Sequence, residues 1–490
     1  MFGWTGIEQK AQLLRSRTFQ GRPRSLGSPN PTGARGWHKT CAVLILVLVP
    51  VLATIPTPTT KALPGPSERP NVLVIVTDDQ RVDSLDIMRR VRERLVPTAT
   101  NFTNAFATTP LCCPSRASIL TGRYMHNHKV YANSNDATAN LEPKSMLQYY
   151  LKQAGYQTAI FGKYFNGWPL DIDPPHFDRW AVTSYLYYGA KFNIQGKVQR
   201  VQRYSTSFIS DKAANFIKNT SQGNDPWFAY VAPVAAHAPF QPDRRYKRAA
   251  VTPLQSSPAM SESNRTDKPR WVSEETFGPR SAAEVRRQQL RTLLTADDMI
   301  GRLLRLLDEM GEADNTLVIF LSDNGYLWGE HGLDDKRLPY LPSVRIPLLV
   351  RWPGHLAPGA TDGRMAATID IAPTVLSAAS VIPDRGMDGR SLTVPWDRQR
   401  LLLEYERDDP PFEKVPDWAA TLTRDTQYVE YYSDAGGTIF KEYYDLVADP
   451  WQLTNLLGDG DDSNDPSEAV LDTLARQLQQ DSRCQGPTCP

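Results

Sequence analysis

Cysteine is scarce in this sequence, which has only five among 490 residues. So few cysteines exclude a small scaffold held together by disulfides, and the 41% hydrophobic content is enough for a substantial core. Cys484 and Cys489 enclose four residues at the C-terminus, and in an exported protein we expect them to close a small disulfide ring. Cys41 lies near the N-terminus. Cys112 and Cys113 are adjacent, a spacing at which a mutual disulfide is strained, so this pair needs another explanation.

An excess of charge of one sign is also missing. The chain has 55 lysines and arginines against 54 aspartates and glutamates, which gives a net charge of +1 at pH 7. This balance argues against a nucleic-acid partner and against attraction to an acidic membrane surface. Any recognition of an anion must therefore be local.

No hydrophobic run is long enough to cross a membrane. The run 41-CAVLILVLVPVLATI-55 would span roughly 22 Å as a helix, short of the roughly 30 Å hydrocarbon core, and Pro50 interrupts it. We interpret residues 1–55 as a leader, either a signal peptide that ends near 51-VLA-53 or an uncleaved N-terminal anchor; a buried core helix is the alternative. The Pro/Thr-rich residues 56–70 are expected to form a linker. The protein is therefore expected to be secreted or held in the cell envelope, with membrane contact only through an uncleaved leader.

Helical and extended patterns alternate along the rest of the chain. The runs 71-NVLVIVTDD-79 and 315-NTLVIFLSDN-324 are continuously apolar, as expected of strands buried on both faces of a parallel sheet, and 226–240 contains another. Residues 282–311 have the pattern of a long helix that leads into the second strand. The fold class is therefore α/β, with a mostly parallel sheet between layers of helices.

The pattern changes after about residue 395. Short alternating segments at 400–406, 427–432 and 439–446 are typical of antiparallel strands, and 467–481 of a terminal helix. We therefore expect a main domain over 71–395 and a smaller antiparallel α+β subdomain over 396–490. The polar, basic and Pro/Ser-rich stretch 243–270 is expected to be a surface excursion near the rim of the site.

Pairs of oxygen-bearing side chains follow the two acid-tipped strands. Asp78 and Asp79 end the first strand, and Asp323 and Asn324 end the second. In open α/β sheets ligands bind at the carboxyl ends of strands, and hard oxygen ligands suit Ca²⁺ or Mg²⁺. Each pair alone could simply cap a strand; two such pairs in one chain favour a metal site.

The adjacent cysteines open the stretch 111-LCCPSRASILTGRYMHNH-128. Pro114 fits the first turn of a helix, and Gly122 lies near the end of the helical pattern. Cys112 would therefore lie at a helix N-terminus, where free N–H groups attract an anion, with Arg116 as a bidentate donor nearby. The arrangement suits a tetrahedral oxyanion.

The segment 112-CCPSRASILTGR-123 also resembles the type I sulfatases, whose signature C-x-P-S-R-x-x-x-x-T-G-R it matches at every fixed position. The resemblance implies an alkaline-phosphatase-like fold, a divalent cation, and oxidation of Cys112 to formylglycine by a dedicated maturation enzyme; Cys113 takes the variable position. It further implies that Asp78, Asp79, Asp323, Asn324 and Cys112 face the metal, and that Arg116, Lys163, His237 and Lys336 act on the sulfate ester.

Within that family the sequence is most similar to the branch of N-acetylglucosamine-6-sulfatases and heparan endosulfatases. The resemblance rests on the CCPSR doublet, 124-YMHNHKVYAN-133, 161-FGKYFNGW-168 and 322-SDNGYLWGEHGLDDKR-337. Many arylsulfatases have Lys-x-His at the catalytic lysine, whereas Tyr164 and Phe165 follow Lys163 here. The base that deprotonates the formylglycine diol is therefore open, and His128 or His126 is our candidate; each could instead bind sugar or be structural.

The resemblance implies an exported hydrolase of sulfate monoesters on a sulfated small molecule or glycan, of the N-acetylglucosamine-6-sulfate type. His237 or Lys336 would protonate the leaving oxygen, and His331 is a possible rim residue. The alternatives are an arylsulfatase, a phosphodiester or phosphonate monoester hydrolase of the same superfamily, and a non-catalytic glycan-binding protein.

Overall fold

The structure is a computed structural model that describes residues 69–134, 136–408 and 414–490. The expected leader, most of the expected linker and Cys41 lie outside the described residues. Within the described part of the chain, no helix combines the length and the apolar character that a membrane span requires.

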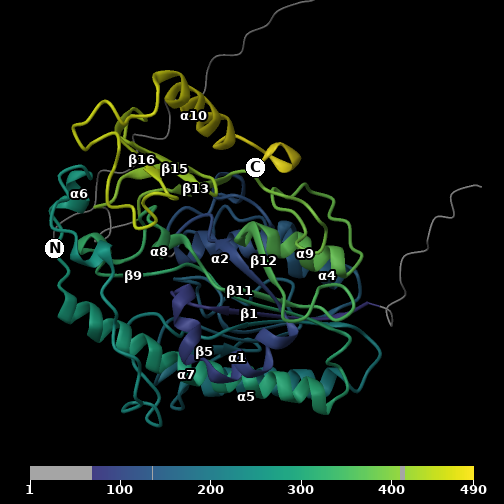
Figure 1. Ribbon diagram of the computed structural model, residues 1–490. Helices are drawn as coiled ribbons and strands as arrows, with labels where there is room; N and C mark the ends of the chain where they lie inside the picture. Colours follow the sequence, from purple (N-terminus) through teal and green to yellow (C-terminus); the bar gives the residue numbers. More distant parts are fainter. Residues whose placement is uncertain (1–68, 135, 409–413) are drawn as a thin grey trace, which may run out of the picture. The chain divides into compact units, whose positions relative to one another are not determined.

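A sheet of ten strands forms the centre of the main domain (Figure 1). The strand order is β12-β2-β11-β8-β1-β7-β3-β4-β5-β6. The pairs that β1 makes with β7 and β8, and β3 with β4 and β7, are parallel, whereas β11, β5 and β6 run antiparallel to their neighbours. In chain order the strands are β1 Asn71–Thr77, β2 Thr100–Phe106, β3 Gln157–Lys163, β4 Arg179–Thr183, β5 Ala190–Ile194, β6 Lys197–Val201, β7 Trp227–Ala232, β8 Thr316–Ser322, β11 Leu348–Arg351 and β12 Thr361–Ala367.

The continuous apolar pattern of β1 has a direct structural cause. Val72, Val74 and Val76 pack into the core on one face of the sheet, whereas Leu73 and Ile75 pack into the core on the other face. Because both faces are covered, the positions between Asn71 and Thr77 all carry apolar side chains. The mostly parallel α/β sheet expected from the sequence is confirmed.

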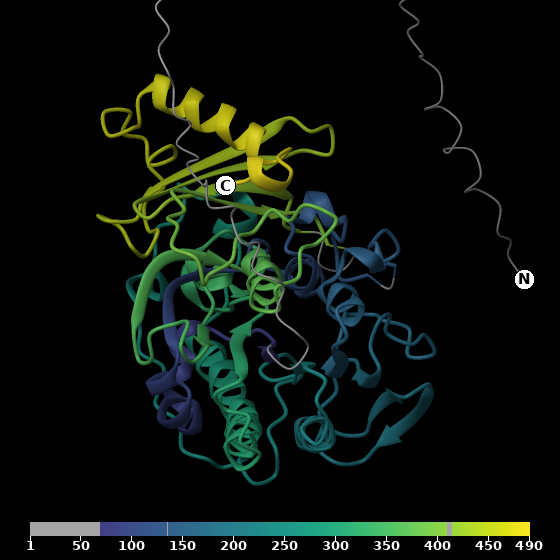
Figure 2. The same ribbon diagram turned by 90° about the vertical axis from the view of Figure 1, so that its right-hand side faces the viewer.

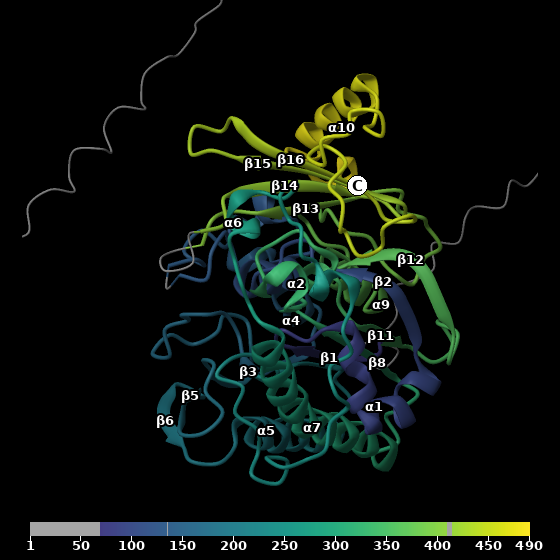
Figure 3. The same ribbon diagram turned by 60° about the vertical axis from the view of Figure 1, so that its left-hand side comes forward.

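Two layers of helices cover the two faces (Figures 1 and 3). The long helix α7 packs against α5 and α1 on one face, and the shorter helices α2, α4 and α9 pack on the other. Their bounds are α1 Arg89–Arg94, α2 Cys112–Thr121, α4 Leu147–Gln153, α5 Ser205–Thr220, α7 Pro279–Glu309 and α9 Ile371–Ala378.

A second, four-stranded antiparallel sheet forms near the C-terminus, with the order β13-β14-β15-β16. Helix α10, Glu468–Asp481, lies beside it (Figure 2) and contributes Leu478 to its core. Cys484 and Cys489 form the expected disulfide. The strands are β13 Leu401–Tyr405, β14 Asp417–Leu422, β15 Thr426–Tyr432 and β16 Thr438–Asp445.

Several elements were not predicted. The strands β2, β4, β5, β6, β12 and β14 were not predicted, because their short patterns mix polar and apolar residues. The expected strand within 226–240 ends at Ala232, so the segment with His237 is a loop beyond β7 rather than part of the strand.

Gly162 in β3 allows a close approach of two strands next to the carboxyl ends of the sheet. Its φ is +114°, and a Cβ built at this position would overlap the carbonyl of Ala232 in β7. We expect Gly162→Ala to lower the free energy of unfolding by at least about 2 kcal/mol, because the backbone itself must shift. Urea denaturation measures this change. The matched control is Gly363→Ala in β12, where open space surrounds the position; equal losses in both variants would contradict the explanation.

Candidate active site

The register between β1 and β8 brings the four predicted oxygen ligands together. Thr77 lies opposite Ser322 in the parallel pair, so the residues that follow each strand end are neighbours. The N–H of Asp79 donates to Asp323 Oδ1 over 3.1 Å. The Asn324 amide donates to Asp79 Oδ1 over 2.8 Å. All four side chains, those of Asp78, Asp79, Asp323 and Asn324, are buried.

Helix α2 brings Cys112 to the same cluster. Cys112 is the first residue of this helix, and Gly122 ends it in the left-handed conformation, as the sequence predicted. The Cys112 thiol lies 3.4 Å from Asp78 Oδ1 and 3.8 Å from Asp79 Oδ1. Ser115, one turn along, donates a hydrogen bond to the Asp323 carbonyl and so fixes the helix against β8. Cys113 points elsewhere: its sulfur accepts a hydrogen bond from the Asn166 N–H.

Three cationic side chains surround the carboxylates. Lys163 Nζ lies 2.6 Å from Asp78 Oδ2, and Arg116 Nε lies 2.8 Å from Asp323 Oδ2. Lys336 Nζ pairs with Asp79 and lies 3.2 Å from Cys112 Sγ. Each of these three side chains is at most 2% exposed. Three carboxylates and three cations therefore balance one another within a buried volume.

The surrounding charges shift the pKa values of the buried acids in different directions. Burial alone would raise the pKa of Asp78, but the positive charges around it, with Lys163 the largest, hold that pKa well below its usual range. Burial and the neighbouring Asp78 raise the pKa of Asp323 to about 7, because its own cation, Arg116, compensates only in part. Burial also raises the pKa of the Cys112 thiol well above its usual value. The Cys112 thiol is therefore neutral at pH 7.

The donor set fits a hard divalent cation. Ligand atoms of Asp78, Asp79, Cys112 and Asp323 all lie within 4.8 Å of one another. Asn324 adds an amide oxygen, Oδ1, which is buried and has no hydrogen-bond partner among the described residues. An unpaired buried carbonyl oxygen next to three carboxylates is an arrangement that Ca²⁺ or Mg²⁺ would satisfy.

His237 lies at the mouth of the cluster. Its Nδ1 contacts the carbonyl of Ala238 over 2.6 Å, which makes Nδ1 the protonated nitrogen of the neutral ring. Its Nε2 is 3.9 Å from Asp79 Oδ2, and the side chain is 18% exposed. His237 can therefore exchange a proton through Nε2 between the cluster and the outside.

The structure does not bring the other predicted histidines to the cluster. His128 is buried; its Nε2 lies 3.1 Å from Ser118 Oγ, its Nδ1 accepts from the Val130 N–H, and burial lowers its pKa to about 3. His126 pairs with Glu404, and His331 pairs with Glu262. Both nitrogens of His128 are occupied, so the geometry argues against our choice of His128 as the base. The family resemblance singled out His237, whereas the tertiary partners of His126, His128 and His331 could not be read from the sequence.

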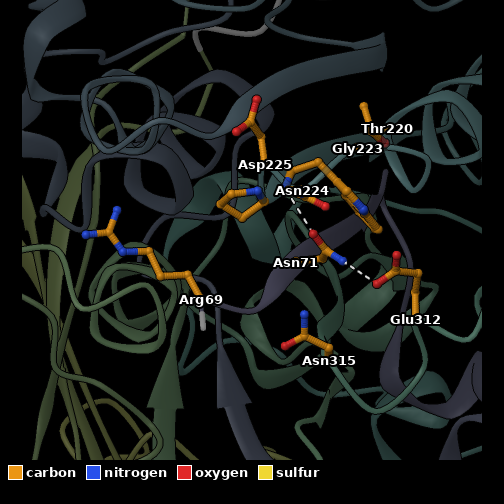
Figure 4. A pocket seen from close by; sticks show the side chains of 10 residues that line it. Arg69, Asn71, Thr220, Gly223, Asn224, Asp225, Glu312 and Asn315 are labelled. Atoms are coloured by element: carbon orange, nitrogen blue, oxygen red, sulfur yellow. Dashed lines mark hydrogen bonds between the residues drawn. The ribbon is translucent and has the colours of Figure 1, made fainter. Parts of the chain in front are cut away.

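A separate polar pocket of about 180 Å³ lies at the opposite end of β1 (Figure 4). Asn71, the first residue of β1, donates to Glu312 Oε2 and accepts from the Trp227 N–H. Arg69, Asn224, Asp225 and Asn315 also line it. The pocket contains no nucleophile of the cysteine or serine type, and none of the predicted site residues lines it.

The sequence is similar to several known proteins. The profile of the sulfatase family matches residues 70–381, and that of the C-terminal region of N-sulphoglucosamine sulphohydrolase matches residues 329–483. The N-acetylglucosamine-6-sulfatase of Homo sapiens is 28% identical over 538 residues, covering 97% of this chain and 93% of that protein. The extracellular sulfatase SULF-1 homolog of Drosophila melanogaster is 33% identical over 347 residues, covering 66% of this chain and 31% of that protein.

Among solved structures, a protein in complex with its substrate D-glucosamine-2-N,6-O-disulfate has the same fold, with a TM-score of 0.74. It is 24% identical, and the alignment covers 85% of this chain and 98% of that chain. The alkaline-phosphatase-like architecture expected from the sequence is thereby confirmed.

The pair of His126 and Glu404 makes stability depend on pH. The two side chains are 2.9 Å apart, and the His126 side chain is 19% exposed. Burial lowers the pKa of His126, but the hydrogen bond and charge of Glu404 outweigh it and raise the pKa to about 8. Against an unfolded value of about 6.5, the pair contributes up to about 2 kcal/mol below about pH 6.5, and this contribution is lost as the pH rises through about 8.

Urea unfolding of the wild type and of His126→Gln at about pH 6 and about pH 9 tests this linkage. We expect the wild type to lose up to about 2 kcal/mol more than the variant over this interval. Identical pH dependence of the two proteins would contradict the assignment.

Proposed function

The chain belongs to the sulfatase family, and from that premise we propose that it removes 6-O-sulfate from glucosamine units of a sulfated glycan. We propose further that its nucleophile is a formylglycine formed from Cys112 and that a divalent cation lies among Asp78, Asp79, Asp323 and Asn324. The observation that carries the proposal is the convergence of the Cys112 sulfur, three carboxylates and three cations at the carboxyl ends of β1 and β8. The names of the human relative and of the substrate-bound structure support the choice of sugar.

Modification of Cys112 explains how a buried thiol could support hydrolysis. The raised pKa of the thiol disfavours the thiolate, so unmodified Cys112 is a poor nucleophile at neutral pH. As formylglycine, the residue would supply two hydroxyls of an aldehyde hydrate, one to attack sulfur and one to release sulfate by losing its proton. This proposal requires a maturation enzyme as a partner.

The charges of the cluster determine which ligand it can accept. Asp78, Asp79 and Asp323 balance Lys163, Lys336 and Arg116, so the cluster is close to neutral as it stands. A divalent cation would leave an excess of positive charge, which would attract a sulfate monoester with one negative charge and also favour a deprotonated hydroxyl on the nucleophile. The cation would supply Lewis acidity at a sulfate oxygen and at the nucleophilic hydroxyl. Lys163 and Arg116 would hold the sulfate oxygens while the bond to the leaving alcohol breaks.

Two groups can give a proton to the leaving oxygen. Lys336 is protonated before the reaction and so has a proton to donate. Its pairing with Asp79 outweighs the effect of burial and raises its pKa well above the usual value. His237 faces the cluster through Nε2, and burial lowers its pKa. The neutral ring is therefore favoured, and His237 is better suited to pass a proton on than to remain protonated. His237 is also the described histidine best placed to accept the proton of the second hydroxyl, the role for which the sequence offers His128 or His126.

Export is part of the proposal. The predicted leader, the disulfide between Cys484 and Cys489 and the extracellular relative of Drosophila melanogaster all support it. The disulfide is stable in an oxidising compartment and would be reduced in most cytosols.

Substitution of the two adjacent cysteines separates their roles. We expect Cys112→Ala to lower sulfate release from N-acetylglucosamine-6-sulfate by at least about 10³-fold, because the nucleophile is lost. Cys113→Ala should retain activity within about tenfold, since its sulfur contacts the Asn166 backbone rather than the cluster. Ion chromatography of released sulfate measures both.

A phosphodiester and a phosphonate monoester serve as competing substrates in the same assay. Preferred turnover of either one would contradict a sulfatase and favour the related hydrolases. Equal activity of Cys112→Ala and wild type on the sulfate ester would exclude Cys112 as the nucleophile.

Cation binding should stabilise the folded protein. At a hundredfold excess over Kd, Ca²⁺ adds about 2.7 kcal/mol to the free energy of unfolding, which for a domain of this size raises Tm by several degrees. We expect this rise after chelator treatment and addition of Ca²⁺, and a much smaller rise in Asn324→Ala, which lacks the unpaired amide oxygen. Differential scanning fluorimetry measures both. The same Ca²⁺-dependent shift in Asn324→Ala would place the cation elsewhere.

A further inference from the structure

We propose that the surface next to His237 binds an extended anionic glycan chain, so that the substrate is an oligosaccharide or polysaccharide rather than a free sugar. We define this surface, the rim face, as Tyr185, Leu186, Arg244, Lys247 and Arg248. The inference rests on the proposed function, because it places the sulfated unit in the cluster and the rest of the chain on the rim face.

The rim face begins at the mouth of the cluster. The Tyr185 ring lies 6.2 Å from the His237 ring, centre to centre. Tyr185 is 49% exposed and Leu186 is 38% exposed. Both belong to the loop between β4 and β5, near one end of the main sheet (Figure 3). A substituent attached to a sulfate ester in the cluster that leaves past His237 would meet the exposed Tyr185 ring.

Hydrogen bonds hold the loop and the neighbouring basic segment together. The Tyr187 hydroxyl donates to the His237 carbonyl over 2.7 Å. The Arg244 N–H donates to the Tyr188 hydroxyl over 3.0 Å, and the Tyr204 hydroxyl donates to the Gln241 carbonyl over 3.1 Å. The loop after β4 and the segment after His237 therefore form one continuous, preorganised surface.

Unpaired cations are concentrated on this basic segment. Two successive turns, closed by Tyr246 N–H to Asp243 and Ala249 N–H to Tyr246, bring the residues between them close together. Arg245 is used internally, because it pairs with Asp243 and Asp298. Arg244, Lys247 and Arg248 are exposed, and none of them forms an ion pair with a described residue. Three exposed positive charges without an ion pair among the described residues thus lie on this segment, within the polar and basic stretch that the sequence predicts to be a surface excursion near the site.

The combination fits a sulfated glycan. Sugar rings have an apolar face that packs on a tyrosine, and sulfate or carboxylate groups along the chain match the exposed cations. An apolar partner would leave the cations desolvated and unpaired, which is costly. The proposal commits to a polyanionic glycan; nucleic acid, which also carries repeated negative charges, becomes an outcome of the test.

The experiment compares a monosaccharide with an oligosaccharide. Sulfate release is measured from N-acetylglucosamine-6-sulfate and from a 6-O-sulfated heparan hexasaccharide, for the wild type and for Arg244→Glu/Lys247→Glu/Arg248→Glu. We expect the triple variant to raise KM for the hexasaccharide by about tenfold or more, with kcat unchanged, and to leave KM for the monosaccharide within about twofold. Added salt should raise KM for the hexasaccharide in the wild type more than in the variant.

The matched control reverses three exposed cations elsewhere, Lys144→Glu/Lys218→Glu/Arg476→Glu. An equal rise in KM in the control would show a general charge effect and overturn the proposal, as would equal effects of the rim variant on both substrates. Tyr185→Ala should raise KM for the hexasaccharide, whereas Tyr185→Phe should restore it.

Direct binding separates this inference from the proposed function. If the wild type releases no sulfate from either substrate, the proposed function fails. Calorimetric titration with the hexasaccharide still tests whether the rim face binds the glycan. Binding that the rim variant weakens about tenfold supports it, and unchanged binding overturns it. A single-stranded DNA of matched charge that binds equally well, with the same loss in the variant, would overturn the assignment to a glycan.

Discussion

The parallel pairing of β1 with β8 is the interaction on which the site depends. Thr77 opposite Ser322 makes the strand ends coincide, so residues separated by about 245 positions in the chain become neighbours. A shift of register by one residue would turn Asp78 and Asp323 to opposite faces of the sheet. Backbone pairing from Asn71 opposite Thr316 to Thr77 opposite Ser322, together with the hydrogen bond that the Asp79 N–H donates to Asp323, holds this register.

The buried charges impose a second constraint. Three carboxylates placed side by side would repel one another, and three cations offset this repulsion. They come from three different places: helix α2, the end of β3, and the loop that follows strand β10 (Asp334–Asp335). Helix α2 contributes both a cation, Arg116, and Cys112, the residue that we propose as the nucleophile, so its position affects the charge balance and the proposed chemistry together. Gly162, Ser115 and the contacts of the Cys113 segment all serve to hold these elements against the strand ends.

The sequence allowed much of this to be predicted, and the reasons are local. The apolar runs ending in Asp78–Asp79 and Asp323–Asn324 indicated strands with ligands at their ends, and the turn residues around Cys112 indicated a helix start. The short strands β4 to β6 and β14 escaped prediction because segments of five or six residues that mix polar and apolar side chains lack a clear period. The structural roles of His126, His128 and His331 could not be predicted from the sequence, since Glu404, Ser118 and Glu262 become their partners only through tertiary structure. The roles of the site residues remain predictions.

The central claim is that Cys112 acts only after conversion to formylglycine within a cation-binding cluster. The most direct measurement determines, by mass spectrometry of the tryptic peptide that contains Cys112, the converted fraction in preparations made with different amounts of maturation enzyme, alongside sulfate release from each. The account predicts that activity rises in proportion to the converted fraction and extrapolates to zero for the unmodified thiol. Full activity in protein whose Cys112 is entirely unmodified would contradict it.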